Sequence, residues 1–336
     1  MNKALLTILK YVVFLGLGIY ITYHMLSELS DTQRKELFDA IRSINALYLI
    51  PISAAGVLSH YFRTVRWKYL LRTIDLHPTT TNTFFAVMIG YITNLALPRA
   101  GEVAKCTVLA KYEDMPAHKM VGTIVAERAF DVLSLIVISV TAYLIEFQRI
   151  NDYISPKLGH LVDKVKSHEV VLIGLFVVMA LAVVAAVVLY RKHKETKIGQ
   201  LVKEMTHGIM SIVHMKEKWQ FLFFTVLMWF MYFAQIFLGL YSLSPTHHLH
   251  AMASWIVLVY GSLGLIATPG GIGAYPYLVE QILHGPYNIP EVPAQAFGWI
   301  AWLVQTFVIL LFGIISLLVI HTYNNRRNAK AGLGKK

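Results

Sequence analysis

Residues 90–102 read Gly-Tyr-Ile-Thr-Asn-Leu-Ala-Leu-Pro-Arg-Ala-Gly-Glu, an apolar segment that ends in proline and then in charge. A second charged string follows, because residues 127–131 read Glu-Arg-Ala-Phe-Asp inside the next apolar segment. Charged side chains are costly at membrane depth and usually have a functional role there. These two strings are therefore the first candidates for a functional site.

The composition identifies the chain as a membrane protein with several spans. Its 336 residues are 56% hydrophobic and only 15% charged, and the mean hydropathy is +0.56. A single soluble core cannot bury that much apolar surface. Most apolar segments approach the roughly 20 residues that cross hydrocarbon as a helix, which predicts an all-α polytopic fold. The segments are 5–26, 44–62, 82–97, 121–145, 170–190, 219–243, 252–268 and 294–320.

The distribution of Lys and Arg predicts how these segments cross the membrane. If all eight crossed, the basic residues would be shared almost equally between the two sides, against the positive-inside tendency. Most of them lie inside if 82–97 returns through the short run 103–112 and 252–268 returns through 272–284. This arrangement has six full spans, two broken pairs and cytoplasmic N- and C-termini. Each broken pair is either a re-entrant hairpin or a full span with a short one.

The two broken pairs also resemble each other in sequence. Residues 90–101 align with residues 261–272, with glycine, alanine and proline matching at the same spacing. Together with their opposite entry sides, this indicates an inverted repeat whose broken helices meet near the midplane, where transporters bind substrate. The alternative is a pair of ordinary loops between closely spaced spans. The predicted units are a single membrane domain at 1–322, with repeat halves at about 1–145 and 170–322, and a basic, disordered cytoplasmic tail at 323–336.

Proline and glycine supply the backbone of each predicted break. Proline stops a helix because it lacks an amide hydrogen and clashes with the preceding turn. Glycine permits tight turns and a close approach of two backbones. The structural residues predicted at the two breaks are Pro98, Gly101, Pro269, Gly270, Gly271 and Gly273.

The first break carries a candidate site for a lipid headgroup. Arg99 and Glu102 lie at the break, and a guanidinium beside a carboxylate is suited to bind a phosphate or a carboxylate. The start of the following helix would add its free amide groups. Lys105 is interpreted as a loop charge in water. Tyr91 and Asn94, on the preceding helix, either meet the headgroup or bond to neighbouring backbone.

Three more charges lie inside the fourth apolar segment. Glu127 and Asp131 are one helical turn apart and share a face, and Arg128 lies about 100° round the same helix. We expect these groups to pair with the first break or with Arg63 and Arg66 at the inner end of the second span. The alternative is a static salt-bridge network, and the two roles are compatible.

Other polar residues receive a plainer interpretation. His247, His248 and His250 are expected to form a solvated turn, because no carboxylate accompanies them. Glu280, after the second break, is considered as a counter-charge to a basic group across the repeat axis. The single cysteine, Cys106, excludes an intrachain disulfide. No Walker loop, zinc motif, nucleophile elbow or Rossmann fingerprint occurs, so we predict no metal, no cofactor and no nucleic-acid partner.

Four strings give the chain a family resemblance. They are Arg-Thr-Val-Arg-Trp-Lys-Tyr-Leu-Leu at 63–71, the strings at 97–102 and 127–131, and Thr-Pro-Gly-Gly-Ile-Gly at 268–273. The chain resembles the lysylphosphatidylglycerol synthase transmembrane region family over about residues 5–322. The resemblance implies a flippase-like membrane domain that moves a lipid with a modified headgroup between leaflets. The family's best-known members also have a soluble aminoacyltransferase domain, which nothing in this sequence resembles, so lysyl transfer is not expected.

The function predicted from the sequence is that of a flippase-like, multi-pass protein of the bacterial cytoplasmic membrane, not an enzyme. Its partner is a membrane phospholipid or lipid-linked substrate with a polar or anionic headgroup. One alternative is a membrane-embedded lipid-modifying transferase with Glu127 or Asp131 as base. Another is a lipid-binding partner subunit of a cytosolic synthase, which the basic loop 191–218 would contact. Both signs of charge occur at the site, so the cargo stays open, as does the oligomeric state.

Overall fold

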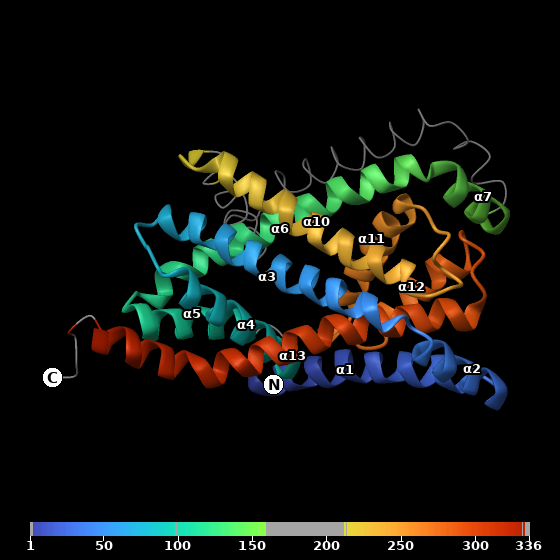
Figure 1. The fold of residues 1–336 in the computed structure, drawn as a ribbon, viewed down its shortest axis with the longest axis horizontal. Helices are drawn as coiled ribbons and strands as arrows, with labels where there is room; N and C mark the ends of the chain where they lie inside the picture. The colour runs from blue at the N-terminus through green and yellow to red at the C-terminus, as the bar shows by residue number, and fades with distance from the viewer. Residues whose placement is uncertain (1–2, 98–99, 159–211, 213, 331, 333–336) are drawn as a thin grey trace.

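Figure 1 shows the computed structural model, an elongated bundle of helices. The described part of the chain forms eleven α-helices, two short 3-10 helices and no strand, which confirms the predicted all-α class. The predicted span 170–190 lies outside the described residues, as does most of the basic loop 191–218. The structure describes residues 3–97, 100–158, 212, 214–330 and 332.

Long helices run along the molecule, and two pairs of shorter helices lie between them (Figure 1). The first part of the chain contains α1 (Lys3–Ser27), α2 (Asp31–Arg42), η1 (Ala46–Tyr48), α3 (Leu49–Arg72), α4 (Thr80–Ala96), α5 (Ala100–Glu113), α6 (Ala117–Ile145) and α7 (Phe147–Leu158). The second part contains α10 (Lys218–Tyr241), α11 (Ala251–Ala267), η4 (Pro269–Gly271), α12 (Ala274–His284) and α13 (Glu291–Lys330).

Three of the described helices, α6, α10 and α13, are long and apolar enough to cross a membrane. The number becomes four if α2 and the following η1–α3, bent by 56° at their junction, count as one span. Helices α6, α10 and α13 correspond to the predicted segments 121–145, 219–243 and 294–320. The apolar pattern therefore located α6, α10 and the start of α13 to within a few residues, whereas α13 ends at Lys330 rather than at residue 320.

Helices α4 and α5 form a hairpin of two short helices. They have 17 and 14 residues. At about 1.5 Å per residue they measure roughly 25 and 21 Å, less than the roughly 30 Å of the hydrocarbon core. The start of α4 lies beside the end of α5, because the amide of Thr79, the N-cap of α4, donates to the Glu113 carboxylate at 3.2 Å. The chain thus enters and leaves this hairpin on one side, as both arrangements predicted for this pair require (Figure 1).

Helices α11 and α12 form a second hairpin, which enters from the opposite end of the molecule (Figure 1). The chain reverses at η4, where Gly270, Gly271 and Gly273 have φ angles of +63°, +74° and +70°. Residues with a Cβ atom rarely adopt this left-handed conformation. The glycines predicted at the second break are therefore needed for the turn itself.

Packing between the elements relates the two hairpin units to each other. Helix α3 packs along α10, and the two run in opposite directions (Figure 1). The helix that follows each hairpin packs on the first helix of the other one, α13 on α4 and α6 on α11. The two tips also meet, since a Cβ atom built on Gly270 lies 3.0 Å from Cδ2 of Leu95. We call residues 49–145 and 218–330, each a hairpin with its neighbouring long helices, the two units.

Helix α13 continues beyond the predicted end of the membrane domain. It runs to Lys330, whereas the sequence predicts a disordered tail from residue 323. Asn324 is buried and exchanges side-chain hydrogen bonds of 2.8 Å with Asn82 of α4. One turn later, Arg327 donates to Glu113 at 2.8 Å. The structure therefore corrects the prediction over 323–330, because basic composition alone does not reveal these partners on the first hairpin.

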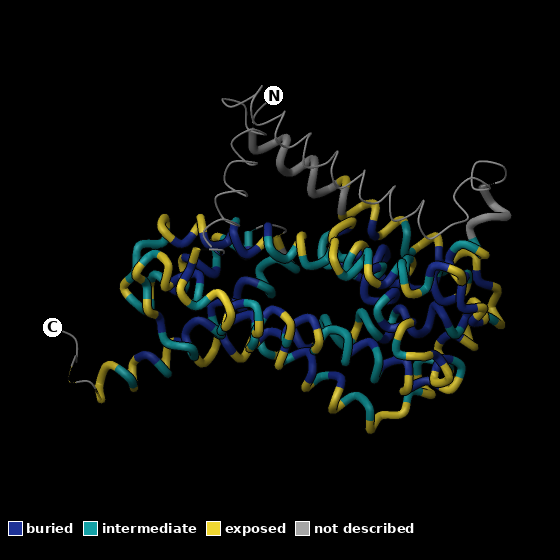
Figure 2. Tube along the Cα trace, turned by 90° about the horizontal axis from the view of Figure 1, so that it is seen from above, coloured by how far each residue is buried: buried dark blue, intermediate teal, exposed yellow. Residues whose placement is uncertain are grey.

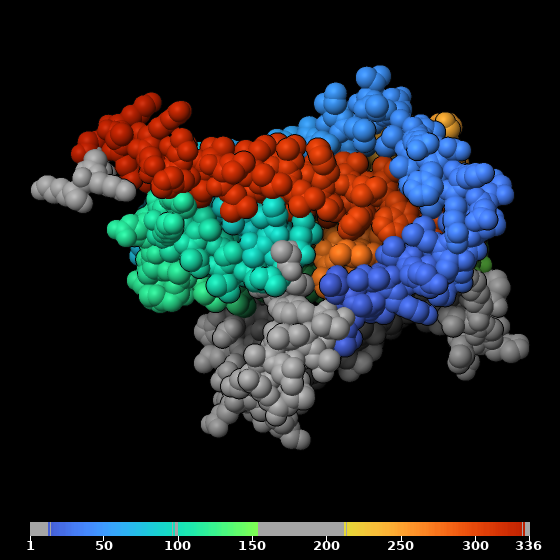
Figure 3. Space-filling model, turned by 90° about the horizontal axis from the view of Figure 1, so that it is seen from below, coloured from blue at the N-terminus to red at the C-terminus, as the bar shows by residue number. Residues whose placement is uncertain are grey.

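The outer surface of the bundle is largely apolar. Exposed residues lie along the outside of the helices and buried ones face inwards (Figure 2). Figure 3 shows α13 crossing the molecule, with α4 and α5 packed on one half of it and α1 and α2 on the other. On this surface Leu318 of α13 is 72% exposed and Val226 of α10 is 66% exposed. Such side chains suit helices that face lipid.

Candidate functional site

A network of ion pairs joins α3 to α6 beside the first hairpin. Arg63 Nη1 donates to Glu127 Oε1 at 2.9 Å and to Asp131 Oδ2 at 2.7 Å. Arg66 Nη2 lies 2.6 Å from Asp131 Oδ1 and 3.4 Å from Glu127 Oε1. The two arginines are one turn apart on α3, and the two carboxylates are one turn apart on α6. The pairing of these four residues predicted from the sequence is confirmed.

Lys105 completes the network from α5. Its Nζ donates to Glu127 Oε2 at 2.7 Å and lies 4.2 Å from the ring centroid of Trp67. The guanidinium of Arg66 similarly lies 5.6 Å from the ring centroid of Phe221. Aromatic rings attract such cations where water is excluded. The interpretation of Lys105 as a loop charge in water is wrong, because the residue is only 7% exposed.

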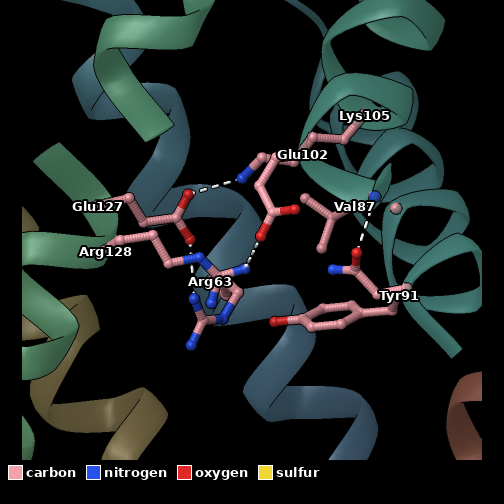
Figure 4. A pocket seen from close by; sticks show the side chains of 10 residues that line it. Arg63, Val87, Tyr91, Glu102, Lys105, Glu127 and Arg128 are labelled. Atoms are coloured by element: carbon pink, nitrogen blue, oxygen red, sulfur yellow. Dashed lines mark hydrogen bonds and ion pairs between the residues drawn. The ribbon is translucent and has the colours of Figure 1, made fainter. Parts of the chain in front are cut away.

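Arg128 reaches from α6 towards the first break. Its Nη2 donates to Glu102 Oε1 at 3.0 Å and so connects α6 to α5. The Arg128 side chain is 46% exposed, whereas that of the adjacent Glu127 is 1% exposed. Arg128 and Arg63 line the same narrow pocket, shown in Figure 4. The predicted pairing of Arg128 with the break is confirmed.

Asn94 and two glycines hold the first hairpin closed. Asn94 Oδ1 accepts a hydrogen bond of 2.8 Å from the backbone amide of Gly101, at the start of α5. The backbones approach closely here, since a Cβ atom built on Gly101 would lie 2.0 Å from the carbonyl oxygen of Gly90. Of the two roles considered for Asn94, the structure shows the bond to neighbouring backbone. Gly101 is required for the close approach, as the sequence predicts.

Tyr91 faces the charged residues from α4. The centroid of its ring lies 4.7 Å from that of His60 on α3. In Figure 4 its hydroxyl group points towards Arg63. His60 lies one turn before Arg63 on α3, and its Nδ1 atom is buried without a hydrogen-bond partner among the described residues. Tyr91 and His60 therefore extend the polar surface beyond the ion pairs.

A cavity of about 420 Å³ lies between the two hairpins. Arg63, Arg128 and Asp131 form its charged end, and most of its other walls are apolar. Both hairpins reach it, with Leu95 from α4 and Gly270 from the second break. The walls therefore come from both units, whereas the arginines and the aspartate come from the first.

Several polar cavity residues were not predicted from the sequence, among them His60, Tyr232 and Gln235. The Tyr232 hydroxyl lies 3.5 Å from Arg63 Nη2. Gln235 is buried one turn later on α10, and its Nε2 has no partner among the described residues. A signal was present, because polar side chains one turn apart inside a span often face a cavity. His60 gives the same signal, because it lies one turn before Arg63 on α3 and shares its face.

Three predicted residues are not part of the described network. Pro98 and Arg99 lie outside the described residues. Glu280 of α12 is 6% exposed, and its described hydrogen bond comes from the neighbouring Gln281 at 3.3 Å. The expected ion pair between Glu280 and a basic group does not occur within the described part of the chain.

Sequence comparison identifies the family. The profile of the lysylphosphatidylglycerol synthase TM region matches residues 7–313. The chain belongs to this family. This family member is also similar to a UPF0104 membrane protein of Methanocaldococcus jannaschii, at 22% identity over 313 residues. That alignment covers 88% of the chain and 91% of the archaeal protein. No solved structure matches the chain significantly.

Proposed function

We propose that this family member moves a lipid between the two leaflets, with the headgroup passing through the cavity between the hairpins. The observation that carries the proposal is that both hairpins line one cavity, which is charged at one end and mostly apolar elsewhere. Broken helices of two inverted repeats that meet at a central site are typical of secondary transporters. Rocking of one unit against the other would open the cavity to each side in turn.

The rim of the cavity supports a lipid as the cargo. Val132 of α6 and Ile266 of α11 line the cavity, yet they are 47% and 70% exposed. An apolar rim that faces hydrocarbon allows acyl chains to remain in the bilayer while the headgroup lies inside. A small water-soluble substrate would not need this lateral opening.

We place the protein in the bacterial cytoplasmic membrane, with six full spans, two re-entrant hairpins and cytoplasmic termini. The support is the positive-inside tendency. With the base of the first hairpin in the cytoplasm, most Lys and Arg of the loops lie on that side. The positions of the segments 170–190 and 191–218 in this topology rest on their sequence alone.

A transporter has more support than the alternative of a transferase. A general base needs a free lone pair within reach of the proton that it removes. Both oxygens of Glu127 are engaged, Oε1 by Arg63 and Arg66 and Oε2 by Lys105. Asp131 likewise contacts both arginines. These carboxylates are suited to hold the helices and the cavity end in place.

Lipid exchange in vesicles tests the proposal. Vesicles with a fluorescent phospholipid are treated with a membrane-impermeant quencher, and the inner-leaflet signal is followed with time. The protein should accelerate its loss. Ser262→Trp, which fills the cavity, should abolish the acceleration, whereas Leu263→Trp on the outer face of α11 should retain it.

Equal rates with and without the protein would contradict transport and favour the lipid-binding subunit. Chemical change of the added lipid, detected by mass spectrometry, would favour the transferase instead. Equal inhibition by Ser262→Trp and Leu263→Trp would remove the cavity from the path.

A further inference from the structure

The buried ion-pair network contains an excess of positive charge. Among the described residues, three cationic side chains, Arg63, Arg66 and Lys105, meet two carboxylates, Glu127 and Asp131. The more exposed pair of Arg128 and Glu102 is balanced and does not change this difference. An uncompensated charge away from water is costly, so a site of this kind favours a counter-ion.

The position of the three cations shows where a counter-ion would bind. Arg66 and Lys105 each lie beside an aromatic ring, that of Phe221 and that of Trp67. Neither of these two cations lines the cavity, whereas Arg63 does. Arg63 Nε is buried and has no hydrogen-bond partner among the described residues. Of the three cations only Arg63 lines the cavity, so a ligand in the cavity would meet the network at Arg63.

Two more donors surround the same end of the cavity. Arg128 also lines it, and one hydrogen bond, to Glu102, is described for its guanidinium group. A guanidinium has five donors, so Arg128 retains donors for a ligand. The Tyr91 hydroxyl points towards Arg63 in Figure 4. Two guanidinium groups and a hydroxyl form a set that suits phosphate oxygens.

We propose that Arg63, Arg128 and Tyr91 bind the phosphate of an anionic lipid headgroup at this end of the cavity. The inference rests on the proposed transport function and deepens it by choosing the charge of the cargo. A zwitterionic lipid carries the same phosphate but adds a cationic group. A lysylated headgroup carries net positive charge, which the excess charge of the network disfavours.

Binding of defined lipids to the purified protein tests this choice. Phosphatidylglycerol, phosphatidylethanolamine, lysylphosphatidylglycerol and inorganic phosphate are titrated separately into the detergent-solubilised protein, and the ligand-induced rise of the unfolding temperature is recorded. The anionic lipid should bind about tenfold more tightly than the other two lipids, the ratio expected for one charge-assisted contact. Inorganic phosphate should compete only at much higher concentration. A stronger effect of phosphate than of the lipid would overturn the lipid as the source.

The variant Arg128→Gln separates the site from general surface charge. It should lose the tenfold preference for the anionic lipid, and Tyr91→Phe should reduce it. Arg149→Gln is the matched control. Arg149 forms an ion pair with Glu146 at 3.0 Å and its side chain is 44% exposed, whereas Arg128 pairs with Glu102 at 3.0 Å and is 46% exposed. An unchanged preference in Arg128→Gln, or an equal loss in Arg149→Gln, would overturn the proposal.

The vesicle assay distinguishes a failure of the transport proposal from a failure of the phosphate-site proposal. Preferential binding of the anionic lipid without exchange between leaflets would contradict transport and leave the phosphate site intact. Exchange that is independent of headgroup charge, or faster for the lysylated lipid, would overturn the phosphate site and leave transport intact.

Discussion

The first hairpin brings Glu102 and Lys105 to the ion pairs at the charged end of the cavity, whereas the second brings Gly270 and Tyr275 to the cavity wall. The two reversals are also closed differently. The first depends on the approach of Gly101 to Gly90, and the second depends on glycines with positive φ. Two hairpins with corresponding packing partners therefore differ in both their chemistry and the construction of their turns.

This difference indicates what an inverted repeat requires of each half. Both halves need a backbone that reverses direction and packs against the other half. Charge is needed only where the ligand binds, and placing it twice would double the cost of burying it. In the proposed transporter, the first hairpin therefore has both a structural and a binding role, whereas the second mainly forms part of the cavity wall.

Neutralising one buried glutamate in each unit gives the largest expected contrast. Glu127→Gln would leave three buried cations with one carboxylate, a change that costs about 3–5 kcal/mol of stability. Glu280→Gln removes a buried charge that has no ion pair among the described residues, so stability should stay the same or rise. Thermal unfolding of both purified variants in the same detergent measures the contrast.

A similar loss of stability in both variants would contradict the assignment of the charged network to the first unit. The variant Glu127→Asp provides a control, because it keeps the charge and shortens the side chain. It should be less destabilised than Glu127→Gln if charge is the main requirement. Equal destabilisation would indicate that shape rather than charge holds the site.

The backbone of the breaks and the main ion pairs could be predicted from the sequence. Proline stops a helix and glycine permits tight turns, so the sequence predicts the two chain reversals at 90–101 and 261–272. Helical spacing placed Glu127 and Asp131 on one face, and burial of their charge left two candidate partners, the first break or Arg63 with Arg66. The structure shows both arginines as partners, with Lys105 added at Glu127. These features depend on residues close together in the chain or on a simple period.

Features that depend on distant packing could not be predicted in this way. A lysine that follows a break can lie in water or in a buried site. The buried position of Lys105 depends on its contacts with Trp67 and Glu127, which lie on other helices. Asn324 is held in helix α13 by Asn82, a residue 242 positions away. Composition gives no information on either contact.

A methyl group added to each turn tests the difference in their construction. Gly101→Ala places a Cβ atom 2.0 Å from the backbone oxygen of Gly90, so the two helices must separate. We expect a loss of about 3 kcal/mol, the upper part of the usual range for overpacking. Gly270→Ala meets only the flexible end of Leu95 at 3.0 Å, and its positive φ should cost about 1–2 kcal/mol.

Unfolding temperatures of the two variants provide the comparison, and Gly122→Ala is the control. A Cβ atom at Gly122 meets no other atom within 4 Å, so this helical position should gain slightly in stability. A larger loss of stability in Gly270→Ala than in Gly101→Ala would contradict this prediction. It would show that the positive φ at the second turn is a stricter requirement than the close backbone approach at the first.

Removing the ion pair at the base of the first hairpin should have the smallest effect on stability. Glu113 lies beyond the apolar part of the hairpin and contacts Thr79, Asn82 and Arg327. Burial raises the pKa of Glu113, but the hydrogen bonds from Thr79, Arg327 and Asn82, together with the charge of Arg327, hold it below its ordinary value. The carboxylate therefore stabilises the fold above its ordinary pKa, and this stabilisation is lost as the pH falls through the lowered value.

Arg327→Gln should reduce stability at neutral pH by about 1 kcal/mol, since Arg327 is partly exposed. Below the pKa of Glu113 the carboxyl group is protonated in both proteins, and the difference should disappear. Unfolding temperatures are compared from pH 7 down to about pH 2, because the pKa of Glu113 lies below its ordinary value of 4.5. The neighbouring exposed Arg326→Gln controls for net charge. A difference that persisted unchanged at low pH would show that Arg327 acts by packing rather than by its charge. Near the end of the second hairpin the corresponding contact is made by His284, whose Nδ1 lies 2.9 Å from the carbonyl oxygen of Ile289, and it involves no carboxylate.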